Sequence, residues 1–129
     1  MLYVWVMLGS ALGGAARYWC SGFAADRFGD TFPWGTLIVN VLGSLVIGFF
    51  ATFTGPDGRF LVGAEARVFV TVGLCGGYTT FSSFSLQTLA LVRDGEIGRA
   101  TGNAALSLLL CMAAVWLGHV SAASLNQLR

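Results

Sequence analysis

The chain carries the segment Gly76-Gly77-Tyr78-Thr79-Thr80-Phe81-Ser82-Ser83-Phe84-Ser85 in the middle of an uncharged, apolar run over residues 68–92. A run of that length can cross a bilayer as one helix. Paired glycines, threonines and clustered serines are poor helix formers, so the segment predicts a membrane helix that is broken at mid-depth. Backbone groups freed by such a break need partners in protein or in an ion-filled cavity, and breaks of this kind often mark ion or substrate sites.

The overall composition also indicates a membrane protein. Of the 129 residues, 56% are hydrophobic and only 10% are charged, and the net charge of +1 excludes a basic surface for nucleic acid. Similar apolar runs occur on both sides of the broken one. We therefore expect an all-α integral membrane protein with a single four-span domain. Its spans lie at about 2–24, 34–54, 64–92 and 99–122, and the third is broken near 76–80.

Small and polar residues within the other spans suggest how the helices pack. The spacing Gly9-x-x-x-Gly13 predicts a small-residue face that another helix can approach closely. Asn40 needs a hydrogen-bonding partner, which is either another helix or a polar pathway. Asn103, Ser107 and Cys111 recur every four residues, so they form a weakly polar stripe that serves interhelical bonding or lines a polar path.

Arg17 lies deeper in the first span than an interfacial residue requires. An arginine at such a depth faces protein or a water-filled vestibule, because facing lipid costs several kcal/mol. The alternative is that Arg17 snorkels to the interface beside Tyr18 and Trp19. His119, near the far end of the fourth span, is expected to be an interfacial residue without a functional role.

The remaining arginines are balanced across the predicted membrane. Orientation follows the excess of Lys and Arg in short loops. The side of the termini and the opposite side hold three each, namely Arg59, Arg67 and Arg129 against Arg27, Arg93 and Arg99. A chain without an orientation preference can insert both ways, and the closed assembly that uses both is an antiparallel two-fold dimer. This balance leads to the hypothesis of a dual-topology homodimer.

The chemistry available in the spans favours a passive path for a small anion. No acidic residue lies at mid-depth, which argues against proton-coupled exchange, and no nucleophile with a base, metal-ligand cluster or phosphate-binding loop indicates an enzyme. Backbone N–H groups at the break, hydroxyls, and the positive edges of Phe81 and Phe84 suit a hydrated anion, while freed carbonyls suit a cation. Aromatic and hydroxyl packing between helices is the alternative explanation of the same residues.

Three motifs together resemble one known family over essentially the whole chain. They are Gly13-Gly14-Ala15-Ala16-Arg17-Tyr18 in the first span, Gly35-Thr36-Leu37-x-Val39-Asn40-x-x-Gly43 in the second, and the broken segment in the third. The chain is similar to the Fluc (CrcB) fluoride channels. The resemblance implies an antiparallel, dual-topology homodimer in the inner (plasma) membrane, with two fluoride pores and a structural sodium ion on the two-fold axis.

The resemblance also implies roles for individual residues. Phe81 and Phe84 match the ring pair that lines the pores, and each pore takes one ring from each subunit. Gly76 and Thr79 match the positions whose backbone carbonyls hold sodium. The remaining predicted pore residues are a vestibule arginine, a pore asparagine, three hydroxyls around the break and one hydroxyl of the fourth-span track: Arg17, Asn40, Thr80, Ser82, Ser83 and Ser107. Asn103 departs from the tyrosine found near that turn in some members, and it and Cys111 are left without a role.

The resemblance implies a passive, fluoride-selective channel that lets cytoplasmic fluoride leave down its electrochemical gradient. The competing class is a small dual-topology, four-span multidrug exporter, for which we would expect a membrane-embedded glutamate in the first span. None is present there. A membrane scaffold, the third class, predicts no ion flux at all.

Overall fold

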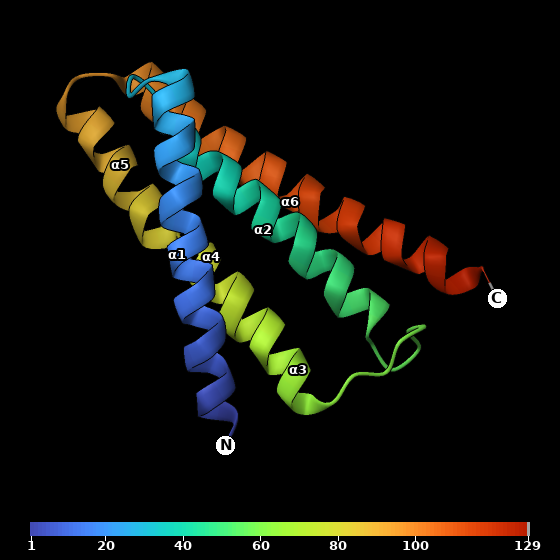
Figure 1. Cartoon of the computed structure of the whole chain (residues 1–129). Coiled ribbons are helices and arrows are strands. Elements are labelled where there is room, and N and C mark those ends of the chain that lie inside the picture. Colours follow the sequence, from blue (N-terminus) through green and yellow to red (C-terminus); the bar gives the residue numbers. More distant parts are fainter. Residues whose placement is uncertain (129) are drawn as a thin grey trace.

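Figure 1 shows a computed structural model that describes residues 1–128. These residues form helices joined by loops and no strand, which confirms the all-α prediction for this part of the chain. The elements are α1 (Leu2–Phe28), α2 (Trp34–Phe53), α3 (Ala64–Val68), the π-helical η1 (Phe69–Cys75), α4 (Gly76–Tyr78), α5 (Phe81–Arg93) and α6 (Ile97–Gln127). Arg129, counted above on the side of the termini, lies outside the described residues.

Judged by length and composition, two of the helices, α2 and α6, are long and apolar enough to cross a membrane. The helix α1 has 27 residues, but charged and small residues dilute its apolar character. The third predicted span is interrupted, so neither of its halves is long enough by itself. We call α3, η1 and α4 the first half of the interrupted helix and α5 its second half.

The interruption consists of two extended residues. The helix continues through the paired glycines, and Gly76 has α-helical angles (φ −64°, ψ −37°). Thr79 (φ −83°, ψ 158°) and Thr80 (φ −154°, ψ 113°) are extended, and α5 begins at Phe81. The break therefore falls on β-branched residues, which accept extended angles readily, and not on the glycines.

The glycines instead permit a close approach between α1 and the first half. Gly9 and Gly13 are both buried, and a Cβ added to Gly9 would lie 2.8 Å from the Cα of Gly73. A Cβ added to Gly77 would lie 2.7 Å from the carbonyl oxygen of Ser10. The predicted small-residue face of the first span is thus confirmed.

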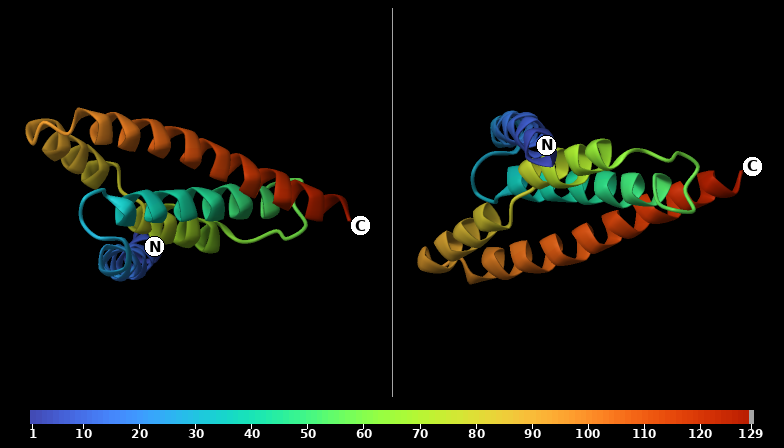
Figure 2. Two further views of the ribbon diagram at one scale, coloured as in Figure 1. Left: turned by 90° about the horizontal axis from the view of Figure 1, so that it is seen from above. Right: turned by 90° about the horizontal axis from the view of Figure 1, so that it is seen from below.

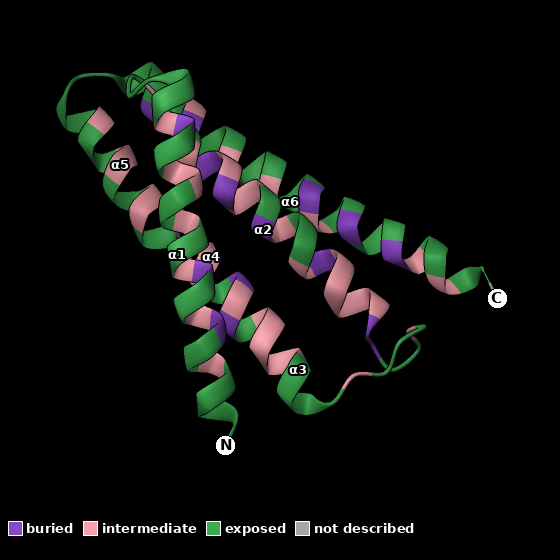
Figure 3. Cartoon of the chain, in the orientation of Figure 1, coloured by how far each residue is buried: buried purple, intermediate pink, exposed green. Residues whose placement is uncertain are grey.

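A second close contact joins α2 and α6, which run side by side in both views of Figure 2. Gly48 and Gly118 are buried at this contact, and a Cβ added to Gly118 would lie 2.7 Å from the backbone nitrogen of Phe49. Figure 3 shows that buried residues follow α2, α6, α1 and η1, whereas α5 has none. The second half of the interrupted helix is therefore more loosely packed than the long helices α1, α2 and α6.

Polar contacts tie the loop between α2 and α3 to its neighbours. The Arg67 guanidinium donates to the carbonyl oxygen of Thr54 (3.0 Å), the residue that directly follows α2. The Asn126 amide accepts from the Arg59 backbone (2.9 Å) and donates to the carbonyl oxygen of Thr52 (3.2 Å). His119 Nδ1 lies 2.8 Å from Thr52 Oγ1, so this histidine takes part in a contact that links α6 to α2.

Candidate functional site

Asn40 of α2 holds the break through both ends of its side-chain amide. Its Oδ1 accepts from the backbone N–H of Thr80 (2.8 Å), and its Nδ2 donates to the carbonyl oxygen of Thr80 (3.0 Å). In a continuous α-helix that N–H would bond to the carbonyl oxygen of Gly76. The Asn40 side chain thus replaces a helical partner at the break, and it leaves the Gly76 carbonyl without its α-helical donor.

Thr80 also caps the start of α5. Its hydroxyl accepts from the backbone N–H of Ser83 (3.1 Å) and lies 3.2 Å from the hydroxyl of Ser82. The N–H groups of Phe81 and Ser82 come first in the helix, where no intrahelical acceptor exists. These groups give the start of α5 a partial positive charge, which favours an anion.

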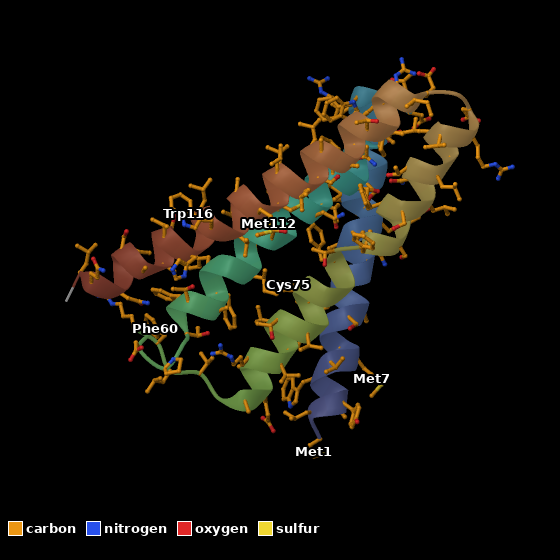
Figure 4. The ribbon with its side chains drawn as sticks, turned by 180° about the vertical axis from the view of Figure 1, so that it is seen from behind. Met1, Met7, Phe60, Cys75, Met112 and Trp116 are labelled. Carbon is orange, nitrogen blue, oxygen red and sulfur yellow. The ribbon has the colours of Figure 1, made fainter. Side chains whose placement is uncertain are left out.

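A groove of about 380 Å³ lies beside the break. It brings together most of the predicted pore and sodium residues, namely Asn40, Gly76, Thr79, Thr80, Phe81, Phe84 and Ser107. The rings of Phe81 and Phe84 are 5.3 Å apart between centroids and are tilted by 49°, and Phe81 is 78% exposed. Cys75 of η1 and Met112 of α6, both labelled in Figure 4, also line this groove.

A second cavity, of about 340 Å³, contains the predicted vestibule arginine. Arg17 lines it together with Ser83, Gln87 and Thr80. Since Thr80 lines both the cavity and the groove, the break lies between the two spaces. Of the two interpretations of Arg17, its half-buried position on a cavity wall favours the vestibule. Ser82 is exposed and is joined to this set through Thr80.

Comparison with known proteins identifies the family. Residues 4–119 match the family model described as CrcB-like protein, Camphor Resistance (CrcB). The chain belongs to this family. A protein named Fluoride-specific ion channel FluC from Methylocella silvestris is 62% identical over 100% of this chain and 98% of its own length. Proteins of the same name from Opitutus terrae and Rhodospirillum rubrum are 61% and 54% identical, over 99% and 98% of this chain.

Two polar residues of this CrcB-family chain, Gln87 and Asn103, have buried side-chain atoms whose surroundings the sequence did not predict. Gln87 of α5 lines the cavity at Arg17 together with Ser83 and Thr80, and its buried Oε1 has no hydrogen-bond partner within residues 1–128. Asn103 is only 1% exposed and donates to the hydroxyl of Thr88 on α5 (2.9 Å). Its place in the stripe was predicted, but its partner was not, because α5 and α6 are paired only by the tertiary structure.

The residues of the α6 stripe in this CrcB-family chain have different surroundings. Asn103 makes an interhelical hydrogen bond to Thr88, whereas Ser107 and Cys111 line the groove. Ser107 is joined to Asn103 by a long contact of 3.4 Å. The groove therefore has hydroxyl and amide donors on two helices and aromatic rings on a third. Such donors can replace the water around a small anion one at a time.

Proposed function

We propose that this chain is a fluoride-selective ion channel through which cytoplasmic fluoride leaves passively down its electrochemical gradient. The observation that carries the proposal is the match, over essentially the full chain, to relatives named as fluoride-specific channels. The break supports it independently, because hydroxyls, an amide and two aromatic rings line the groove there, and no acidic residue lies among them. Such a site stabilises an anion and offers no group for proton coupling.

The proposed path connects the two spaces on either side of the break. Fluoride enters or leaves through the cavity at Arg17, passes the hydroxyls of Ser83 and Thr80, and follows the groove along Phe81 and Phe84. Ser107 continues the path on α6, with Ser82 and Asn40 beside it. Selectivity over chloride would come from path width and donor density.

We propose that two copies assemble as an antiparallel, dual-topology homodimer with two pores. The 78% exposure of Phe81 supports this, because an aromatic ring beside a polar path needs a second surface to complete the wall of that path. The balanced arginines support insertion in both orientations. Each subunit would span the inner membrane with α1, α2, the interrupted helix and α6.

A sodium ion would be held at the dimer axis by backbone oxygens of Gly76 and Thr79. The residues fit such an ion, because the Asn40 contact removes the helical donor of the Gly76 carbonyl, and Gly76 is exposed. Oxygen ligands suit hard cations. The ion would neutralise carbonyl dipoles where two breaks meet, and so stabilise the dimer.

No energy source is needed for export. Hydrogen fluoride is a weak acid that crosses membranes as a neutral molecule and dissociates in the cytoplasm, where the anion is trapped. The inside-negative potential then favours its exit by about 2.3 kcal/mol per 100 mV. The chain in this role moves an ion and makes or breaks no covalent bond.

Fluoride and chloride efflux from liposomes tests the proposal. The purified protein should release fluoride, recorded with a fluoride electrode, and almost no chloride. Replacing Phe81 or Phe84 by Ile should impair fluoride efflux while the dimer elutes unchanged from a sizing column. Equal release of both anions, or none of either, would contradict the proposal, and the second result is what a multidrug exporter or a scaffold predicts.

A further inference from the structure

Asn103 is a deeply buried polar residue at the contact between α5 and α6. Its side chain is 1% exposed, so its amide must be hydrogen-bonded within the protein. The Nδ2 group donates to Thr88 Oγ1 at 2.9 Å, and the Oδ1 atom accepts from the hydroxyl of Ser107 at 3.4 Å. The short contact to Thr88 is therefore the stronger of the two.

The direction of these bonds is determined by the hydroxyl of Thr88. This hydroxyl donates its only proton to the carbonyl oxygen of Phe84, at 2.7 Å. Its oxygen must then accept from Asn103, and a rotated amide would place two acceptors against each other. A chain of hydrogen bonds thus runs from Asn103 through Thr88 to the backbone of Phe84, and we call it the Asn103–Thr88–Phe84 chain.

Apolar packing within the described chain does not hold α5 in one rotation. None of its residues is buried, and Leu86, Leu89 and Val92 are 69%, 53% and 45% exposed. Within residues 1–128, the side-chain hydrogen bonds from other helices reach Thr80, which directly precedes α5, from Asn40, and reach Thr88 from Asn103. One residue of helical rotation, about 100°, would carry Thr88 away from Asn103 and turn the Phe84 ring out of the groove.

We propose that Asn103 is a positioning residue that sets the Phe84 ring in the fluoride path through the Asn103–Thr88–Phe84 chain. The inference rests on the proposed channel function, because the position of the Phe84 ring matters only if the ring lines a fluoride path. Asn103 itself touches no ion in this role. It acts through Thr88, whose hydroxyl must be present for the amide to hold α5.

Variants at Thr88 separate the hydroxyl from the shape of the side chain. Thr88→Val keeps the shape and loses the hydroxyl, so fluoride efflux should fall about fivefold, the equivalent of one hydrogen bond. Thr88→Ser keeps the hydroxyl and should restore efflux to within about twofold of the native rate. Ser85→Ala is the matched control. Ser85 donates to the Phe81 carbonyl oxygen at 2.9 Å in the same way, but it is exposed.

A double-mutant cycle tests the partner on α6. The efflux of Thr88→Val combined with Asn103→Leu should be no lower than that of Thr88→Val alone, because both changes break the same chain. Additive losses would overturn the proposal. So would equal efflux from the Val and Ser variants at position 88, a comparison that does not need Asn103→Leu to fold.

A spectroscopic readout keeps this inference separate from the channel function. Phe84 is replaced by 4-fluorophenylalanine, and its ¹⁹F resonance is recorded in detergent. Thr88→Val should shift or broaden that resonance, whereas Thr88→Ser and Ser85→Ala should not. If the native protein passes no fluoride, the proposed function fails. An unchanged resonance in Thr88→Val overturns the positioning role even if the native protein is a channel.

Discussion

The two halves of the interrupted helix are held by different kinds of interaction. The first half packs against α1 through glycines whose backbones nearly touch, and Gly73 and Cys75 within it are buried. The second half, α5, buries no residue and is tied by Asn40 and Asn103. Both halves belong to one apolar run of sequence, so hydrophobicity alone does not separate them.

This difference shows how one interrupted helix can contain both a rigidly packed half and a half whose side chains remain available to a site. Close backbone packing makes the first half rigid, and it presents the Gly76 carbonyl at a defined place. Amide contacts hold α5 with few apolar contacts, so the rings of Phe81 and Phe84 stay available to a path. Substitutions in the first half should therefore mainly lower the stability of the protein, and substitutions that affect α5 should mainly lower its transport rate.

The largest effect is expected where α1 meets the first half. Gly13→Leu should lower the free energy of unfolding by at least about 3 kcal/mol, because the added side chain overlaps the backbone of the first half. Recovery of monodisperse protein and the thermal midpoint in detergent measure this. The matched control is Gly22→Leu, since a Cβ at Gly22 meets no atom within 4 Å. Equal thermal midpoints of the two variants would contradict the rigid packing of the first half against α1.

The next effect should appear in transport more than in stability. Asn40→Asp cannot donate to the Thr80 carbonyl oxygen and adds a negative charge to the proposed path, so fluoride efflux should fall at least about tenfold. Asn126 offers a matched control, because its amide also bonds to backbone at both ends. Asn126→Asp should lower the thermal midpoint and keep efflux near the native rate. A comparable loss of efflux in both would remove the special role of Asn40.

A smaller, local effect is expected at the cap of α5. Thr80→Val removes the hydroxyl that accepts from Ser83, which costs about 1 kcal/mol of helix stability. Amide hydrogen exchange of Ser83 should become faster by about fivefold, while that of η1 stays unchanged. Thr80→Ser keeps the cap and should exchange like the native protein. Faster exchange throughout the chain would mean that the two halves are not independent.

The smallest effect should follow the loss of the ion pair after α5. Arg99 and Glu96 lie 3.2 Å apart, and both side chains are 48% exposed. Glu96→Gln should change the free energy of unfolding by less than about 0.5 kcal/mol and leave fluoride efflux unchanged. A marked loss of efflux would show that the loop, and not the two asparagines, holds α5.

Much of the fold follows from local features of the sequence. Apolar runs predict the helices, the Gly9 and Gly13 spacing predicts the close face of α1, and the interruption is predicted near residues 76–80. The break itself is displaced from the obvious glycines to Thr79 and Thr80. The low helix propensity of glycine suggested a break at Gly76 and Gly77. Gly77 is helical instead, and its lack of a side chain allows the backbone of Ser10 to lie close to it.

The candidate site was predictable in its residue types and less so in its connections. The motif around Phe81 and Phe84 marked the aromatic pair, and the depth of Arg17 indicated a vestibule. No periodic pattern announces that Asn40 bonds both backbone groups of Thr80, or that Asn103 reaches Thr88. These partners are distant in sequence, so local propensity carries no information about them.

By itself, the sequence determined that the chain is helical and built for a membrane, because composition and period act locally on every turn. It also supplied the residues from which the fluoride path is proposed. Only the tertiary structure decided which backbone groups are free at the break. The reason is physical: the N–H of Thr80 has a choice between the Gly76 carbonyl in its own helix and an amide 40 residues away, and only the packing of α2 brings that amide to 2.8 Å.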